Sequence, residues 1–238
     1  MYMIRARIRL FILTAILFHG MGIIIDAQNL HINHLTEKRG LPSIQVRHVV
    51  QDDFGFIWIA CDGGLVRFDG HEITNYSQHI PSQYGRYFCK TEAGLLLSHD
   101  AGISLIQPAL DTAHISMFMD ASIDPEDQSL YYPGRLFRQS NGAVWVSEPG
   151  GGLIRLQGNE RTRLLPESAD QENTDAKALF AELGQGLMAV AFTSGGLYLY
   201  EESSQSLEKV HRFSRINDLK SNGNELWIAG EHVQRIEL

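Results

Sequence analysis

Acidic or hydroxyl side chains recur at one kind of position in this chain of 238 residues, directly after an apolar run and just ahead of a glycine turn. In chain order these residues are Asp62, Asp100, Glu148, Ser194 and Glu231. If the fold brings their oxygens together around one opening of a channel, they could bind a cation or the hydroxyls of a sugar, and they would repel an acidic ligand. Asp and Glu are also common beside glycine in hairpin turns, so a purely structural explanation stays open.

The rest of the sequence contains no pattern that indicates catalysis or metal binding. It has no nucleophile elbow, phosphate loop, HExxH motif or EF-hand loop. Asp52 and Asp53 are adjacent at a strand end, where their side chains point to opposite sides, which suits a turn better than an acid–base pair. The ten histidines are scattered, which favours surface positions over metal ligation. We expect no catalytic residue, no metal site and no cofactor.

The acidic positions belong to a motif with four parts, which is clearest in residues 51–70. Gly55 precedes an apolar run that contains Trp58, and a glycine pair ending in Gly64 precedes a second apolar run. Both runs are short, rich in β-branched and aromatic residues, and bounded by Gly and Asp, which indicates strands. We predict strands at about 46–51, 56–60, 65–68 and 72–76.

The same motif recurs four times farther along the chain. Clear copies surround Trp145 and Trp227, and weaker copies occupy residues 92–106 and 184–200. Trp145 lies 87 residues after Trp58 and 82 residues before Trp227, and each spacing is two steps of roughly 40 to 45 residues, the period of a four-stranded propeller blade. The glycines that we assign to the turns of the clear later copies are Gly142, Gly152 and Gly223.

These repeats predict an all-β chain that folds as a β-propeller of about five four-stranded blades. The repeats cover approximately residues 37–77, 84–118, 134–165, 176–213 and 215–238. A flat tryptophan on an inner strand packs between neighbouring blades, so we expect Trp58, Trp145 and Trp227 in the core. Residues 174–183 are the best helix candidate, but they fall where a strand must lie and we predict a strand there.

The two ends of the repeat region suggest how the propeller closes. The last copy lacks a fourth strand, and residues 29–36 resemble a fourth strand with nothing before it. Pairing of the two would close the ring through its termini. The alternative is an open propeller, the front of a longer array with its last blade unfinished.

The first 27 residues have the pattern of a secretory signal peptide. Arg5, Arg7 and Arg9 form a basic segment, which is followed by an apolar run at 10–25. Cleavage after Ala27 is the expected processing, and an uncleaved membrane anchor is the alternative. No second long apolar run follows, so we expect residues 28–238 to form a propeller domain that is periplasmic or secreted, without a further membrane span.

The net charge limits the classes of binding partner, and the cysteine content argues against a disulfide-rich fold. Residues 1–27 hold three of the 20 basic and one of the 28 acidic residues, so the mature chain is strongly acidic and has no basic cluster. Nucleic acid and anionic lipid are therefore not expected partners. The two cysteines, Cys61 and Cys89, are too few for a disulfide framework and are expected as buried strand residues, with a disulfide between neighbouring blades as the alternative.

Residues 39–77 resemble the two-component regulator propeller repeat, whose pattern runs GLPS, a strand, D-x-x-G-x-x-W-I-G-T, then G-L and an aromatic residue with Asp-Gly. The matching residues are Gly40 to Ser43, Asp52, Gly55, Trp58, Ile59, Gly64, Leu65, Phe68, Asp69 and Gly70. Ala60 and Cys61 stand where the family usually has Gly-Thr, and Ile44 stands where Asn is usual. The resemblance is strong for this copy, moderate for the third and fifth, and weak for the second and fourth.

This resemblance implies the periplasmic sensor region of a two-component system. In that family many such repeats usually form two large propellers, followed by a β-domain, a membrane span and a histidine kinase, and carbohydrate-derived ligands are the usual inputs. The chain ends at residue 238 without a kinase, so the resemblance carries over only a non-catalytic ligand-binding module with a sensor kinase or other protein as partner. The alternatives are a stand-alone secreted scaffold for protein–protein interaction and, less expected, a propeller lyase or glycosidase.

Overall fold

The computed structural model describes residues 32–122, 130–164, 177–184 and 186–237. Leu35–Leu238 form one structural unit, to which every strand named below belongs. The predicted signal segment, residues 1–27, lies outside the described residues, as do residues 29–31 of the expected N-terminal strand. Within the described ranges, no helix is long and apolar enough to span a bilayer.

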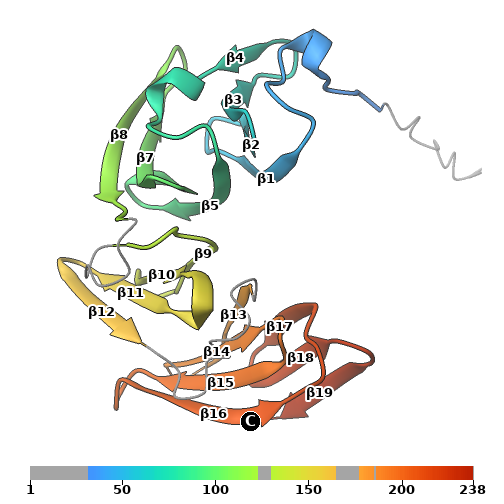
Figure 1. The fold of residues 1–238 in the computed structure, drawn as a ribbon, viewed down its shortest axis with the longest axis vertical. Helices are drawn as coiled ribbons and strands as arrows, with labels where there is room; N and C mark the ends of the chain where they lie inside the picture. The colour runs from blue at the N-terminus through green and yellow to red at the C-terminus, as the bar shows by residue number, and fades with distance from the viewer. Residues whose placement is uncertain (1–31, 123–129, 165–176, 185, 238) are drawn as a thin grey trace, which may run out of the picture. The chain divides into compact units, whose positions relative to one another are not determined.

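The strands form five antiparallel sheets, in which each strand pairs with its neighbour in the sequence (Figure 1). The first sheet consists of β1 (Val46–Gln51), β2 (Ile57–Cys61), β3 (Gly64–Phe68) and β4 (Ile73–Asn75). The second consists of β5 (Gly85–Thr91), β6 (Gly94–His99), β7 (Gly102–Pro108) and β8 (Ala113–Asp120). The third consists of β9 (Leu136–Arg138), β10 (Val144–Ser147), β11 (Leu153–Gln157) and β12 (Glu160–Leu164).

The fourth sheet consists of β13 (Ala178–Glu182), β14 (Leu187–Phe192), β15 (Gly196–Glu201) and β16 (Ser206–Arg212). The fifth consists of β17 (Asp218–Asn222), β18 (Glu225–Ala229) and β19 (Val233–Glu237). The described residues also contain the short 3-10 helices η1 (Glu37–Arg39), η2 (Ser77–His79) and η3 (Pro149–Gly151). The prediction of an all-β propeller with about five blades is confirmed.

The predicted strands of the first repeat coincide with β1 to β4 to within one residue at each end. The strand expected at 174–183 is present as β13, and residues 174–176 lie outside the described residues. Hydrophobic alternation and glycine turns therefore predicted these elements correctly, because both are local properties of a hairpin.

The turn between β2 and β3 requires glycine. Gly64 has a φ of 127°, and a Cβ at this position would lie 2.0 Å from Oγ of Ser77. Gly152 differs from the expected turn geometry, because its φ is −62°, which any residue can adopt. In that turn the left-handed conformation is taken by Gly150 and Gly151, with φ of 74° and 83°.

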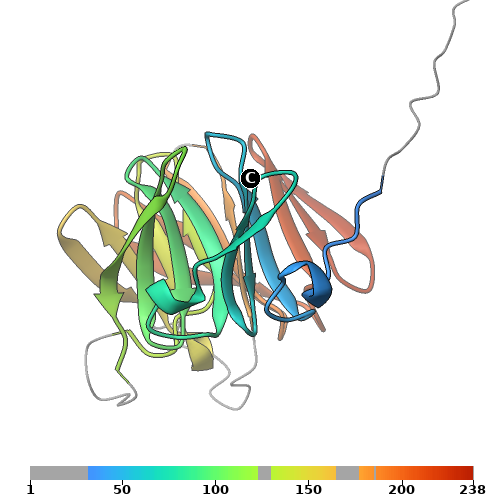
Figure 2. The ribbon, with the colours of Figure 1, turned by 90° about the horizontal axis from the view of Figure 1, so that it is seen from above.

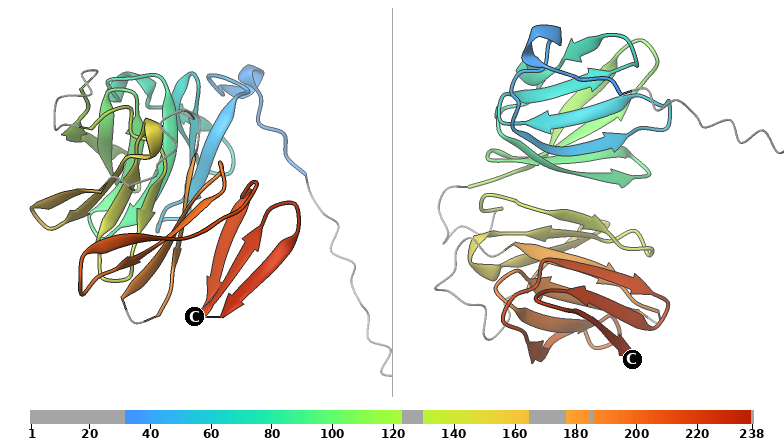
Figure 3. Two further views of the ribbon diagram at one scale, coloured as in Figure 1. Left: turned by 60° about the horizontal axis from the view of Figure 1, so that its bottom comes forward. Right: turned by 90° about the vertical axis from the view of Figure 1, so that its right-hand side faces the viewer.

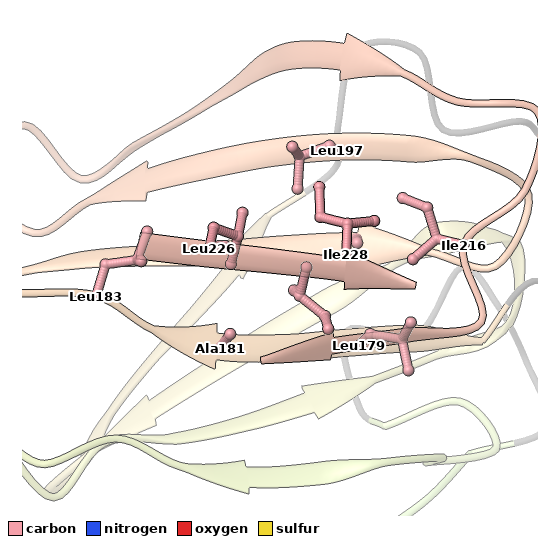
Figure 4. Close-up of a cluster of buried hydrophobic side chains, with 10 residues drawn as sticks. Leu179, Ala181, Leu183, Leu197, Ile216, Leu226 and Ile228 are labelled. Atoms are coloured by element: carbon pink, nitrogen blue, oxygen red, sulfur yellow. The ribbon is translucent and has the colours of Figure 1, made fainter. Parts of the chain in front are cut away.

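Four apolar clusters hold the five sheets together in chain order, and each is formed by side chains from two consecutive sheets. Figure 2 shows the strands of these sheets from a second direction. Leu96 and Leu97 are consecutive in β6 and belong to different clusters, because neighbouring residues of a strand point to opposite faces. Figure 4 shows the cluster between the fourth and fifth sheets, where Leu179, Leu197 and Ile228 converge. Each internal sheet is thus buried on both faces, as a propeller blade must be.

Trp58 and Trp145 face the next sheet along the chain, whereas Trp227 does not. Trp58 in β2 is fully buried in the cluster with the second sheet, and Trp145 in β10 is fully buried in the cluster with the fourth. Trp227 in β18 is 40% exposed, which corrects the expectation of a core position. Its neighbours Leu226 and Ile228 face the fourth sheet, so Trp227 points to the opposite face, where no further sheet packs among the described residues.

The fifth sheet has three strands, and β19 pairs only with β18 among the described residues (Figure 3). Residues 32–36 form no strand. Leu35 instead packs with Leu41, Ile59 and Val66 on the outer face of the first sheet. Among the described residues the N-terminal segment therefore does not close the ring, and the last blade has three strands there, as in the open alternative.

Both cysteines are buried free thiols. Cys61 ends β2, whereas Cys89 of β5 belongs to the cluster that faces the third sheet. The two sulfurs therefore do not join the first two blades, and the disulfide considered from the sequence is not formed.

Candidate functional site

The ends of the second strands of the first three sheets contribute to one cavity of about 330 Å³. Asp62 follows β2, Asp100 follows β6 and Glu148 follows β10, and all three line this cavity. Ser194 is not among its lining residues, and Glu231 lines a separate pocket of about 120 Å³. The structure thus brings together three of the five residues that the repeat pattern singled out.

Asp62 and Asp100 each bind an arginine from the first strand of their own blade. Arg47 Nε and Nη2 donate to the two carboxylate oxygens of Asp62, both over 2.6 Å. Arg86 Nε donates to Oδ1 of Asp100 over 3.0 Å, and its Nη2 donates to the same oxygen. Both arginines lie at register shifts in the pairing of β1 with β2 and of β5 with β6. A bulge of this kind re-aims a side chain, here toward the following loop.

Glu148 has a different cationic partner. Its side chain is 2% exposed, and its Oε2 accepts a hydrogen bond of 2.6 Å from Nη1 of Arg163, which belongs to β12. Its Oε1 accepts the backbone N–H of Tyr131 over 2.7 Å. These contacts compensate the burial of this carboxylate.

The cavity therefore differs from the expected ring of free carboxylates. Its lining contains four cationic side chains, which are Arg47, Arg86, Arg135 and Lys177, against the three carboxylates. Arg163 adds a further positive charge behind Glu148. Among the described residues, no lining carboxylate is left without an arginine partner.

Arg135, which directly precedes β9, has no carboxylate within ion-pair distance in the part of the chain that the structure describes. Its Nε is buried without a hydrogen-bond acceptor there. Its guanidinium carbon lies 5.3 Å from the centre of the Tyr87 ring, which is a cation–π distance. Its backbone N–H donates to Oγ of Ser147 over 2.8 Å, so the backbone at Arg135 is held in place.

Three tyrosines, Tyr84, Tyr87 and Tyr132, also line the cavity. Tyr84 is 55% exposed, which leaves much of its ring open to solvent. Aromatic rings beside charged hydrogen-bonding groups are typical of cavities that hold a polar organic ligand.

The pKa values of Asp62 in the cavity and of His48 beside it are both lowered, for different reasons. The hydrogen bonds from Arg47 lower the pKa of the Asp62 carboxyl, so this group is ionised throughout the neutral range. Burial, with a further contribution from the positive charge of Arg135, lowers the pKa of His48. His48 accepts the backbone N–H of Phe88 at Nδ1 over 3.1 Å, which also requires the unprotonated nitrogen.

Sequence reasoning missed the arginines and tyrosines of the cavity. A signal was present, because Arg47, Arg86 and Arg135 each stand at the beginning of the first strand of a repeat. The tyrosines follow no repeat spacing, so the sequence offered no comparable signal for them. The described residues contain no group of three or more His, Cys, Asp or Glu side chains placed to hold a metal ion.

No model of a known protein family matches the chain, and no curated protein matches it by sequence. Solved structures do resemble it. The extracellular domain of the proposed hybrid two-component system BT4673 from B. thetaiotaomicron aligns with a TM-score of 0.60 and 20% identity, over 83% of this chain and 29% of that domain. That of BT3049 from the same organism aligns with a TM-score of 0.59 and 19% identity, over 82% of this chain and 29% of that domain.

A luciferin-regenerating enzyme aligns less well, with a TM-score of 0.53 and 10% identity over 81% of this chain and 72% of the enzyme. The chain spans less than a third of the length of the two extracellular domains. At these identities the likeness concerns the fold. This chain has the β-propeller fold found in the extracellular domains of two-component sensor systems, as the resemblance of its first repeat implied.

Proposed function

We propose that this chain is a non-catalytic, extracytoplasmic ligand-binding module of a two-component signalling system, and that the cavity of the first three blades holds a small carbohydrate-derived ligand. The observation that carries the proposal is the lining of this cavity, in which bidentate arginine–carboxylate pairs stand beside three tyrosine rings. The propeller fold shared with sensor-system extracellular domains supports the signalling context.

The size of the cavity suits a sugar. A volume of about 330 Å³ lies at the lower end of the range of small-molecule sites. The apolar face of a sugar ring can pack on the exposed ring of Tyr84. Its hydroxyls can donate to the remaining lone pairs of Asp62 and Asp100, whose positions are set by their arginines.

The charge arrangement favours binding over hydrolysis. A glycosidase needs one carboxyl with a raised pKa as general acid beside a second carboxylate. Asp62 has a lowered pKa, which is the opposite of what a general acid requires. Both carboxylate oxygens of Glu148 already accept hydrogen bonds, one from Arg163 and one from the backbone N–H of Tyr131. Glu148 is therefore suited to hold these groups in place and not to transfer a proton.

The test is calorimetric titration of the mature chain with neutral monosaccharides and disaccharides of glucose, galactose, mannose, arabinose and rhamnose. We expect at least one to bind, and the double variant Asp62→Asn/Asp100→Asn to bind it about tenfold more weakly because the charged acceptors are lost. Tyr84→Ala removes an exposed ring and should weaken binding without unfolding the chain. Circular dichroism checks that each variant is folded.

Asp53→Asn is the matched control, because the Asp53 side chain is 96% exposed and does not line the cavity. Unchanged binding in the double variant and in Tyr84→Ala would place the ligand elsewhere. If neither these sugars nor their acidic derivatives bind, the proposal fails and the interaction-scaffold alternative gains support.

A further inference from the structure

We infer that the ligand of this cavity carries an anionic group and that Arg135 binds that group. This inference rests on the proposed function, since it names the ligand class of the same cavity. It reverses the expectation that a ring of acidic residues would repel acidic ligands.

The charge balance of the lining favours an anion. The described lining contains four cationic side chains and three carboxylates, and all three carboxylates are bound by arginines. A cation entering the cavity would meet no unpaired carboxylate among these residues. An anion would meet a surplus of positive charge, which low-dielectric walls strengthen.

Arg135 differs from the other two arginines at the start of a blade. Arg47 and Arg86 each bind the aspartate that follows the second strand of their blade. In the third blade the corresponding carboxylate, Glu148, is bound by Arg163 from the fourth strand instead. Arg135 therefore lines the cavity without the carboxylate partner that its counterparts have in the described structure.

Arg135 is held in place without being neutralised by a carboxylate among the described residues. Its guanidinium lies over the Tyr87 ring, and Ser147 accepts its backbone N–H. Ser98, which is fully buried in the second blade, donates its hydroxyl to the carbonyl of Gly134 over 2.6 Å. Contacts from two blades thus fix the segment around Arg135, and a preorganised guanidinium binds an anion with little loss of side-chain freedom.

The chemistry of the ligand follows from the two kinds of lining group. A guanidinium presents parallel N–H donors that match the two oxygens of a carboxylate or of a sulfate ester. The tyrosine rings and the aspartate oxygens suit a sugar ring with hydroxyls. We therefore assign the cavity to an acidic sugar, in which the anion is a carboxylate or a sulfate ester.

The experiment follows the Nε–H resonance of Arg135 in ¹⁵N–¹H spectra of the mature chain, assigned by its loss in Arg135→Gln. Two matched series are titrated: glucose, glucuronate and glucose 6-sulfate, and galactose, galacturonate and galactose 6-sulfate. We expect an acidic member to shift the resonance and to bind about tenfold more tightly than its neutral parent. Whichever acidic member binds more tightly identifies the anion. Acetate and sulfate serve as anions without a sugar ring.

Arg135→Gln should reduce the preference for the acidic sugar to less than about threefold, and Arg135→Lys should retain part of it because the charge remains without the planar donors. Arg138→Gln is the control, since Arg138 binds Glu92 and does not line the cavity.

Equal affinity for neutral and acidic sugars, or an unchanged preference in Arg135→Gln, would overturn the inference while the proposed function stands. Binding of acetate or sulfate at Arg135 without any sugar binding would keep the anion site and overturn the sugar proposal. No response to any anion would overturn the inference.

Discussion

Trp58 donates its indole Nε1–H to Oδ2 of Asp52 over 2.7 Å, and the other oxygen of Asp52 accepts two backbone N–H groups of the turn between them. Asp52 is only 5% exposed. The third blade repeats the arrangement with an amide, because Trp145 donates to Oε1 of Gln139 over 3.2 Å. In both blades the acceptor stands six residues before the tryptophan. The aspartate of the repeat pattern therefore has a structural role, which is to satisfy a buried indole.

Replacing this aspartate should destabilise the first blade. Asp52→Ala leaves a buried indole N–H and turn N–H groups without their acceptor, so we expect a loss of about 3 kcal/mol in the free energy of unfolding. Asp53→Ala, at an exposed neighbour whose ion pair with Lys90 lies at the surface, should cost less than about 0.5 kcal/mol. Urea unfolding of both variants measures the difference, and equal midpoints would contradict this role for Asp52.

The tryptophans should differ in their contribution to stability. Trp145 is fully buried between the third and fourth sheets, so Trp145→Ala should cost about 4 kcal/mol. Trp227 is 40% exposed, so Trp227→Ala should cost about 1 kcal/mol or less. Thermal or urea unfolding tests the ranking. A cost at Trp227 as large as that at Trp145 would mean that another surface covers the fifth sheet in solution.

His99 predicts a dependence of stability on pH. It is fully buried, its Nε2 lies 2.8 Å from Oγ of Ser104, and its Nδ1 has no partner among the described residues. Burial lowers its pKa from 6.5 to about 4. At a pH between these two values, His99 is protonated in the unfolded chain and neutral in the folded chain. The contribution of His99 to the free energy of unfolding is therefore fully present above pH 6.5 and falls as the pH drops toward 4.

The fall attributable to His99 should reach about 3 kcal/mol, an order-of-magnitude value obtained by linkage from that change in pKa. It is measured as the difference between wild type and His99→Leu in urea unfolding at pH 7, 6, 5 and 4.5, because other acid-sensitive groups are common to both proteins. A constant difference across this range would show that His99 does not titrate on unfolding.

The two thiols should resist modification in the folded protein. Burial raises the pKa of Cys89 to about 11 and also raises that of Cys61, so neither forms the reactive thiolate at neutral pH. We expect Ellman's reagent to react slowly with the native chain and with both cysteines in denaturant. Rapid reaction of one native thiol would indicate local opening of its blade, and loss of both thiols in denaturant would indicate a disulfide.

The propeller fold could be predicted from the sequence because its determinants are local. The order of glycine, Trp58, glycine pair and apolar run describes one hairpin with its turns, and its recurrence at a constant spacing gives the blade period. The positions of Asp62, Asp100 and Glu148 after the second strands follow from the same register. The sequence also showed that the last repeat lacks a fourth strand. The N-terminal segment proposed to pair with β19 forms no strand at residues 32–36.

The character of the cavity was decided only by the tertiary structure. Arg47 and Asp62 are fifteen residues apart, and a bulge in β1 directs the arginine toward the aspartate. Glu148 is bound from β12 and Arg135 remains without a carboxylate partner in the described structure, a distinction that no residue pattern within a repeat predicts. By itself the sequence determined the blades and the placement of the acidic residues, because strand alternation and turn geometry act over a few neighbouring residues. The pairing of strands within each blade decided that these carboxylates are neutralised, because ion pairing depends on where side chains from separate strands meet. The packing of the first three blades then gathered these pairs with Arg135 in one cavity, whose described lining has more cationic than anionic side chains.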